Sequence, residues 1–332
     1  MDIKNKKIIV TGGAGFIGSH LVGALLDDGA EVMVLDNFSS GKMSNLSQYS
    51  SNRKLRVVKA DILDRKRLFK LFRGVHSVYH LATQCLRISI NNPQLVHEVN
   101  STGTLNVCQA AQEHKLKRLI YVSSSEAYGS AQYAPMDEKH PCQPTTIYGS
   151  SKLTGELYAR SFLNTYGLPV VIVRPFNTYG PRSHFEGAHG EVIPKFVLRA
   201  LNNKAPVIFG DGRQTRDFTY VSDVVEGIIL ASRADWLVAG TVNIAYGKEV
   251  SIAKIARLVL DATGMYKLKP KKGKARPADV RRHYADISLA KRRLKYRPRV
   301  GIEKGIKKYV DWVKANNIDL AACLKQEELY NW

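Results

Sequence analysis

Cysteine, acidic residues and long apolar runs are all scarce in this chain, and each scarcity excludes a class of protein. The sequence has four cysteines, at spacings that suit neither a metal site nor a disulfide framework: Cys85, Cys108, Cys142 and Cys323. No apolar run approaches the roughly 20 residues that a membrane-spanning helix needs. The charged start, Met1 to Lys7, has neither the apolar stretch nor the cleavage site of a signal peptide. We therefore expect a cytoplasmic protein with reduced thiols, no membrane span and no bound metal.

Acidic residues are outnumbered by basic ones. The chain has 29 Asp and Glu against 50 Lys and Arg, which gives a formal net charge of +21. Much of the excess falls late, at residues 267–274, 281–282 and 291–299. This balance admits three interpretations: a solvated basic surface, steering of a phosphorylated ligand, or contact with nucleic acid. The basic clusters lack the aromatic interleaving of a single-strand binding platform, so nucleic acid is the least favoured partner.

The first half of the chain alternates short apolar runs with segments of helical spacing. The runs expected to form strands are residues 8–11, 31–36, 55–60, 77–81, 119–123 and 170–174. Helical spacing appears between them, for example at residues 17–26, 68–72 and 103–111. Such alternation predicts βαβ units and an α/β fold, a Rossmann-type, doubly wound parallel sheet.

A glycine-rich turn, residues 11–18, joins the first expected strand to the first helix. Its glycines, Gly12, Gly15 and Gly18, suit a tight turn, close approach of the backbone to a pyrophosphate, and close packing of helix on strand. A diphosphate would lie at the helix N-terminus, where the helix dipole favours negative charge. Asp36 ends the second expected strand, 18 residues after Gly18, where a carboxylate accepts from ribose hydroxyls and repels a 2′-phosphate. The pattern predicts NAD rather than NADP.

The second half of the chain loses this rhythm after Phe176 and becomes richer in glycine, proline and polar turns. Two further helices are expected there, at residues 251–263 and 305–315. We therefore divide the chain into an NAD-binding domain, residues 1–176, and a smaller C-terminal lobe for the substrate, residues 177–332. Some segments of the second half are expected to return to the first domain.

Tyr148 and Lys152 are four residues apart, so they share one face of a helix. A tyrosine with its usual pKa of about 10 is a poor base at neutral pH, but a neighbouring cation favours the phenolate. At an effective dielectric of about 20, a charge about 4 Å away is worth about 4 kcal/mol, enough to lower the pKa substantially. Ser124, at the end of the fifth expected strand, is placed to share the proton of a substrate hydroxyl with Tyr148. The alternative is a surface helix that carries the pair by chance.

Together these motifs resemble the extended short-chain dehydrogenase/reductase family, the NAD-dependent nucleotide-sugar epimerases and dehydratases. The resemblance runs from Thr11 to about Trp312, and its matching segments are residues 11–18, 36–41, 80–82, 100–104, 121–129, 148–152, 174–182 and 216–221. It implies that Ser124, Tyr148 and Lys152 form the catalytic triad. It also implies an NAD that is reduced and reoxidised within one turnover, and a homodimer built on paired helices.

The resemblance and the motifs give two sets of binding residues. Those expected at the dinucleotide are Gly12, Gly15, Phe16, Ile17, Gly18, Asp36, Asn37, Ser40, Gly41, Asp61, Ile62, Leu81, Ala82, Asn100, Ser123, Tyr148 and Lys152. Those expected at the nucleotide sugar are Asn177, Arg182, Val192, Lys195, Arg216 and Arg276. Arg182 is the candidate for holding a uronate carboxylate, with an ordinary loop arginine as the alternative. Residues 192–194 look like the segment that covers the nucleotide base.

Ser125 and Glu126 stand where the branches of this family differ. Its 4,6-dehydratases carry Asp-Glu, or a small residue and Glu, and the Glu removes the C5 proton of the sugar. Uronate decarboxylases also keep a Glu here, whereas simple 4-epimerases usually carry small or neutral residues. Glu126 thus favours dehydration of a UDP- or dTDP-hexose after transient oxidation at C4, although Ser125 departs from the Asp-Glu pattern.

Several alternatives stay open. The reaction can instead be 4-epimerisation, including that of a uronate, or decarboxylation of UDP-glucuronate, and Glu126 can be a structural hydrogen-bonding residue. An alternative of another class is a basic, RNA-binding relative of this fold, which only the net charge of +21 supports.

Overall fold

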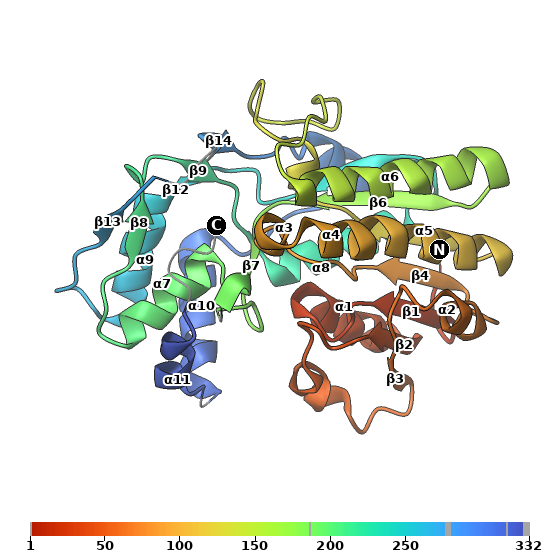
Figure 1. Cartoon of the computed structure of the whole chain (residues 1–332), viewed down its shortest axis with the longest axis horizontal. Helices are drawn as coiled ribbons and strands as arrows, with labels where there is room; N and C mark the ends of the chain where they lie inside the picture. Colours follow the sequence, from red (N-terminus) through yellow and green to blue (C-terminus); the bar gives the residue numbers. More distant parts are fainter. Residues whose placement is uncertain (1, 186, 276–279, 317, 328–332) are drawn as a thin grey trace.

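A parallel β-sheet forms the centre of the larger part of the molecule (Figure 1). The computed structural model describes residues 2–185, 187–275, 280–316 and 318–327. Within them the main sheet has seven parallel strands in the order β3-β2-β1-β4-β5-β6-β11. Their bounds are β1 Lys7–Thr11, β2 Glu31–Asp36, β3 Leu55–Lys59, β4 Ser77–His80, β5 Arg118–Val122, β6 Val170–Pro175 and β11 Thr241–Ile244. The strand order reverses between β1 and β4, and doubly wound sheets bind ligands at the carboxyl ends beside such a reversal.

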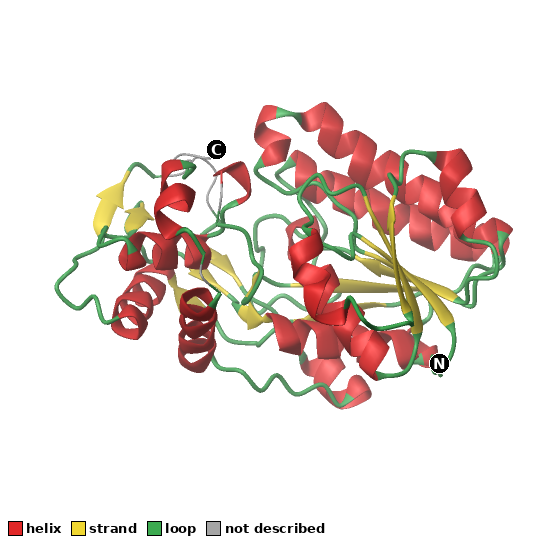
Figure 2. Cartoon of the chain, turned by 90° about the horizontal axis from the view of Figure 1, so that it is seen from below, coloured by secondary structure: helices red, strands yellow, loops and turns green. Residues whose placement is uncertain are grey.

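Successive residues of each strand pack on opposite faces of the sheet. In β1, Ile8 and Val10 belong to one apolar core and Ile9 to another, as the two-residue period of a strand dictates. Helices α1 (Phe16–Asp27) and α8 (Val221–Arg233) cover the first core, and α2 (Arg65–Leu71), α5 (Gly103–Glu113) and α6 (Ile147–Tyr166) cover the second. Figure 2 shows the helices on both sides of the strands. Because both faces are buried, these strands appear in the sequence as continuous apolar runs.

Most of the chain after β6 builds a smaller lobe, at the left of Figure 1. Its helices are α7 (Val192–Leu201), α9 (Ile252–Thr263), α10 (Ile302–Ala315) and α11 (Leu320–Lys325). Its short strands are β7 (Thr178–Tyr179), β8 (Val207–Phe209), β9 (Thr215–Arg216), β10 (Thr219–Tyr220), β12 (Val250–Ser251), β13 (Lys271–Gly273) and β14 (Arg282–His283). Two segments of the second half belong to the sheet instead: α8 covers one of its faces, and β11 pairs with β6.

Short elements complete the described part of the chain. Between β4 and α5 lie α3 (Ile88–Asn91), α4 (Pro93–His97) and the π-helical turn η2 (Glu98–Thr102). Another π-helical turn is η6 (Ala290–Leu294), and short 3₁₀ turns are η1 (Met43–Tyr49), η3 (Ser125–Ala127), η4 (Gly187–His189) and η5 (Asp235–Leu237). None of the helices in the described residues combines the length and the hydrophobicity that a membrane-spanning helix needs.

The predicted α/β fold with a doubly wound parallel sheet is confirmed. Each of the six expected strands is present, with ends that differ from the prediction by at most one residue. The expected helix at 305–315 begins earlier, at Ile302. Strand β11 was not predicted, because its four residues, Thr-Val-Asn-Ile, form no continuous apolar run. The polar side chains of β11 are buried with hydrogen-bond partners, since Thr241 accepts from Arg160 and Asn243 accepts from Tyr128.

Candidate active site

A cavity of about 480 Å³ lies between the carboxyl ends of the sheet strands and the smaller lobe. Its wall combines the turn after β1, the segments that follow β4, β5 and β6, and the first turns of α6 and α7. The predicted site residues that line it are Gly12, Gly15, Phe16, Ile17, Gly18, Asp36, Asn37, Ser40, Asp61, Ile62, Leu81, Ala82, Ser123, Ser124, Ser125, Glu126, Tyr148, Lys152, Asn177, Val192, Lys195 and Arg216. The fold thus brings together residues from distant parts of the chain, in the crevice where doubly wound sheets bind ligands.

The turn after β1 exposes backbone to the cavity because it lacks side chains. Gly12 has a φ of +68°, and a Cβ on it would lie 2.8 Å from the backbone nitrogen of Ala82. A Cβ on Gly18 would meet the carbonyl oxygen of Gly12, so α1 packs tightly on the turn. Gly15 precedes α1, whose N-terminus has no side-chain cap. A helix N-terminus that faces a cavity without a capping side chain is suited to a phosphate group.

Asp36, at the end of β2, is held in place by the backbone of this turn and of its own strand end. Its Oδ2 accepts from the Ala14 N–H at 2.9 Å, and its Oδ1 accepts from the Phe38 N–H at 2.8 Å. Burial raises the pKa of Asp36, and these two hydrogen bonds oppose the rise. Gly41 packs against the carboxylate, since a Cβ there would lie 2.8 Å from Oδ2. Gly41 therefore makes room for Asp36 rather than lining the cavity.

Asn100 supports the cavity wall from behind and is 1% exposed. Its Oδ1 accepts from the Gln84 N–H at 2.7 Å and from the Thr83 hydroxyl at 3.0 Å. Its Nδ2 donates to the Ser151 hydroxyl at 3.0 Å. The amide thereby ties the segment after β4 to α6, next to Lys152. Asn100 was expected at the dinucleotide, but it supports the wall and does not line the cavity.

Ser124 and Tyr148 are hydrogen-bonded to each other in the cavity wall. Ser124 follows β5, and its Oγ accepts from the Glu126 N–H at 3.2 Å, which fixes the turn that carries Glu126. Thr146 caps α6 by accepting from the Gly149 N–H at 3.0 Å, which places Tyr148 in the first helical turn. Burial raises the pKa of Tyr148 well above its usual value; the bond with Ser124 lowers it, and the charge of Glu126 raises it.

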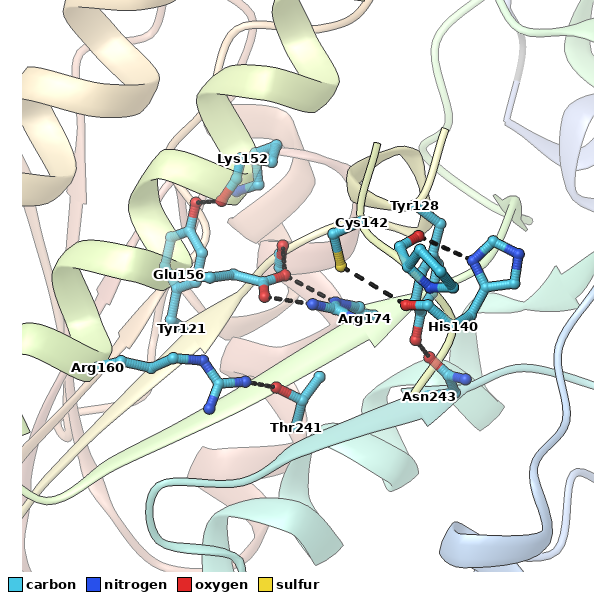
Figure 3. Close-up of polar contacts among 12 residues, drawn as sticks. Tyr121, Tyr128, His140, Cys142, Lys152, Glu156, Arg160, Arg174, Thr241 and Asn243 are labelled. Carbon is cyan, nitrogen blue, oxygen red and sulfur yellow. Dashed lines mark hydrogen bonds and ion pairs between the residues drawn. The ribbon is translucent and has the colours of Figure 1, made fainter. Parts of the chain in front are cut away.

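Lys152 lies one turn further along α6 and is 2% exposed (Figure 3). Its Nζ donates to the carbonyl oxygen of Val122 at 2.8 Å and lies 4.5 Å from the centre of the Tyr121 ring. Burial lowers the pKa of Lys152 to about 7, and the charge of Glu156 opposes this. Tyr148 and Lys152 line one cavity from one helical face, as their spacing predicts. Burial, however, shifts both pKa values toward the neutral forms, against the phenolate that the sequence motif alone suggests.

The end of the cavity in the smaller lobe offers hydrogen-bond donors. The Nδ2 of Asn177 is buried and has no hydrogen-bond partner among the described residues. Arg216, in β9, is held by two carbonyl oxygens, since its Nη1 donates to Thr215 at 2.8 Å and to Val280 at 2.6 Å. Val192 and Lys195 reach the cavity from α7. An orphaned amide donor and an oriented guanidinium suit an anionic, oxygen-rich ligand.

One predicted substrate contact is not found at this end. Arg182 contacts α1 instead of the cavity: its Nη1 donates to the Ser19 hydroxyl at 3.2 Å, and it also bonds Tyr49. Arg182 has a left-handed backbone conformation, with a φ of +69°, and its side chain points toward Ser19 in α1. The position therefore gives no support to Arg182 as the holder of a uronate carboxylate. Arg276 lies outside the described residues.

Some residues of the cavity wall were not named individually as site residues from the sequence. They are Gln84, Cys85 and Arg87 after β4, and His184, His189 and Glu191 before α7. Burial raises the pKa of Glu191 to about 7, and the charge of Arg87 opposes this. The first group could have been found, because the carboxyl end of a sheet strand is where such folds bind ligands. Within the described residues, no cluster of His, Cys, Asp or Glu is arranged to hold a metal ion.

Known proteins are similar to this chain over most of its length. Residues 9–309 match the family model described as GDP-mannose 4,6-dehydratase. The UDP-glucose 4-epimerase of Mycolicibacterium smegmatis is 34% identical over 93% of this chain and 98% of its own. The UDP-glucuronic acid decarboxylase 1 of Xenopus tropicalis is 33% identical over 93% of this chain and 72% of its own. The dTDP-glucose 4,6-dehydratase DesIV of Streptomyces venezuelae, solved with NAD bound, is 32% identical with a TM-score of 0.88, over 93% of this chain and 97% of its own.

Proposed function

Because the chain belongs to the GDP-mannose 4,6-dehydratase family of nucleotide-sugar-modifying short-chain dehydrogenases/reductases, we propose that it oxidises the sugar of a UDP- or dTDP-hexose transiently at C4. The observation that carries this proposal is the position of Ser124, Tyr148 and Lys152 in one cavity with the glycine turn. The best-supported outcome is a 4,6-dehydration in which Glu126 takes part.

The residues at the sheet end of the cavity fit NAD. The turn with Gly12, Gly15 and Gly18 and the uncapped N-terminus of α1 suit its diphosphate. The carboxylate of Asp36 suits the two hydroxyls of its adenosine ribose and disfavours the 2′-phosphate of NADP. When bound, NAD supplies the acceptor for the C4 hydride and returns that hydride later in the turnover.

The chain's own residues handle the protons. Tyr148 takes the proton of the C4 hydroxyl, and Ser124 shares that hydrogen bond. The C4 ketone acidifies the neighbouring C5–H, and Glu126 removes that proton. The C6 hydroxyl then leaves as water with the proton that Glu126 took from C5, and a double bond forms between C5 and C6. Return of the hydride to C6 and of a proton to C5 completes the 4-keto-6-deoxy sugar. Asn177 and Arg216 hold the nucleotide diphosphate at the lobe end, so that C4 faces Tyr148.

A specific observation keeps 4-epimerisation as the second candidate. Ser125 occupies the position at which a dehydratase of the Asp-Glu pattern carries its acid, and it lines the cavity beside Glu126. An epimerase needs no acid there, because the 4-keto sugar only turns over and takes back the hydride. Decarboxylation of a uronate is less supported, because Arg182 bonds Ser19 instead of lining the cavity.

Product analysis distinguishes these reactions. Purified protein is incubated with UDP-glucose, dTDP-glucose, UDP-GlcNAc and UDP-glucuronate, and the products are examined by mass spectrometry and NMR. We expect loss of water; unchanged mass with inverted C4 would show epimerisation, and loss of carbon dioxide would show decarboxylation. In a dehydratase, Glu126→Gln should accumulate the 4-keto hexose and slow elimination by roughly 100-fold. An unchanged elimination rate would contradict the role of Glu126.

We also propose that the chain forms a homodimer through α6. Two large apolar side chains on this helix, Ile147 and Leu157, are 47% and 55% exposed, and a second copy would cover them. Light scattering tests this, since Leu157→Glu should convert a dimer into a monomer. A wild-type protein that is monomeric at micromolar concentration would contradict the proposal.

A further inference from the structure

A buried carboxylate lies directly behind the catalytic lysine. Glu156 is one helical turn beyond Lys152 on α6 and is 1% exposed. It accepts a hydrogen bond from the Ser123 hydroxyl at 2.6 Å. It also accepts two bonds from Arg174, from Nε at 2.8 Å and from Nη2 at 2.6 Å (Figure 3). This bidentate, charge-assisted arrangement fixes the carboxylate in a site without solvent.

The bonds of Glu156 join β6 to the two segments that carry the catalytic residues, which are α6 and the segment after β5. Ser123 follows β5 and directly precedes Ser124, while Glu156 itself belongs to α6. Arg174 belongs to β6, and its guanidinium lies 4.4 Å from the centre of the Tyr128 ring, at the end of the turn that carries Glu126. One carboxylate therefore sets the position of the serine, of the helix with Tyr148 and of the Glu126 turn relative to one another.

Glu156 is also the charged group that favours the cation of Lys152. On the β5 side, Lys152 meets the carbonyl of Val122 and the ring of Tyr121, which are both uncharged. On the β4 side stands His80, whose pKa burial lowers to about 3, with a further contribution from Lys152. His80 is therefore neutral at physiological pH. Arg174, bound to the same carboxylate, carries a positive charge and would disfavour the lysine cation if Glu156 were lost.

We propose that Glu156 is a positioning residue for the oxidation step, which fixes the catalytic segments and holds Lys152 as a cation beside Tyr148. The inference rests on the proposed function, because it concerns the proton transfer from the sugar hydroxyl. In this proposal Tyr148 and Lys152, one helical turn apart on α6, act as a coupled pair. When the pair carries one titratable proton, that proton is on either Lys152 or Tyr148. With the proton on Lys152, the pair is an ammonium and a phenolate, which is active; with the proton on Tyr148, it is a neutral amine and a phenol, which is inactive. The negative charge of Glu156 favours the active form.

The test is the pH dependence of a single oxidation in Glu156→Gln. Glutamine keeps the shape of the side chain and the bond from Ser123 but removes the charge. The formation of NADH is followed after mixing the enzyme with the nucleotide sugar, of the four named above, that the wild-type protein oxidises. At low pH both proteins hold the ammonium, so their rates should agree. At high pH the variant should be roughly tenfold slower, because an opposite charge nearby shifts a pKa by about one pH unit or more. A deficit of the same factor at every pH, or none, would overturn the proposal.

Two further variants separate this role from a merely structural one. Glu156→Gln leaves the Arg174 cation unpaired and lowers the Tm; Glu156→Gln with Arg174→Met removes both charges and should recover stability. The high-pH deficit should persist in this double variant, and its return to the wild-type rate would overturn the proposal.

The matched control is Arg160→Ala, one turn further along α6, where Arg160 donates to Thr241 at 2.6 Å and to the Ala239 carbonyl at 2.8 Å. It should oxidise at the wild-type rate at every pH.

A readout without turnover keeps this inference distinct from the proposed function. If the wild-type protein oxidises none of the four nucleotide sugars, the proposed function fails. The pKa of Lys152 is then measured by NMR of protein labelled with carbon-13 in its lysine side chains, with Lys152→Met to assign the signal. Glu156→Gln should lower this pKa by about one pH unit or more. An unchanged pKa would overturn the role of Glu156.

Discussion

The two ends of the cavity are built in different ways. At the dinucleotide end the wall is mainly backbone: the turn after β1, the N-terminus of α1, and a carboxylate that two N–H groups hold. At the sugar end the wall is made of side chains, such as Arg87, Glu191 and Arg216, from segments far apart in the sequence. The first end follows from the fold itself. The second depends on single side chains, so we expect it to set which sugar is bound.

The largest expected effect lies between the two ends, at Tyr148. Tyr148→Phe removes the hydroxyl that takes the substrate proton, so kcat should fall by about a thousandfold or more. NAD should stay bound, because the dinucleotide end is intact. Turnover and the NAD content of the purified protein are measured together, with Tyr266→Phe, at a side chain that is 75% exposed, as control. Near-normal turnover in Tyr148→Phe would remove the basis of the proposed function.

A side chain placed in the glycine turn tests the backbone-built end. The Cβ of Gly18→Val would meet the Gly12 carbonyl oxygen and push α1 from the turn, so the affinity for NAD should fall by roughly 100-fold. Calorimetric titration with NAD measures the loss. Gly301→Ala is the control, because Gly301 has an ordinary φ of −64° at the start of α10. NAD binding at full strength by Gly18→Val would show that the turn is not the diphosphate site.

Two arginines test the end built from side chains. Arg216→Ala removes a guanidinium from the cavity wall, so KM should rise by about 10-fold to 100-fold, as expected for a charge-assisted bond worth about 1.5–3 kcal/mol. Arg182→Ala removes a side chain that bonds Ser19, so KM should stay within about twofold of wild type. Steady-state kinetics of both variants measure the difference. The reverse ranking would restore the role that the sequence suggested for Arg182.

The smallest expected effect is a pH dependence at the sugar end. The pKa of Glu191 is raised to about 7, so its carboxyl is neutral below this pH and negative above it. An anionic substrate should therefore bind more weakly as the pH rises through about 7, with KM increasing a few-fold. Glu191→Gln should flatten this increase. An identical pH profile of KM in Glu191→Gln would show that the carboxyl does not act on the substrate.

The sequence predicts the backbone-built end better than the other, for a physical reason. Gly12, Gly18 and Asp36 act through positions that the strand–turn–helix unit dictates, and the structure places all three at the cavity. Gly41 was expected at the dinucleotide but packs against Asp36, a distinction that spacing cannot make. Two arginines at the sugar end differ from the expectation. Arg182, which was expected to bind substrate, bonds Ser19 and does not line the cavity, whereas Arg87, which no motif indicated, lines it. Side-chain direction in irregular segments depends on tertiary packing, which no local pattern encodes.

The pairing of β11 with β6 also limits how this protein can be cut or recombined. A fragment that ended at residue 176 would keep the nucleotide turn and Tyr148 but leave β6 as an open edge, and such an edge invites self-association. The chain passes from the sheet to the lobe after β6, returns to the sheet with α8 and β11, and then enters the lobe again, so the two parts are interleaved and are not exchangeable modules. Grafting a new sugar specificity onto this scaffold should therefore proceed loop by loop, with β11 and α8 kept in place.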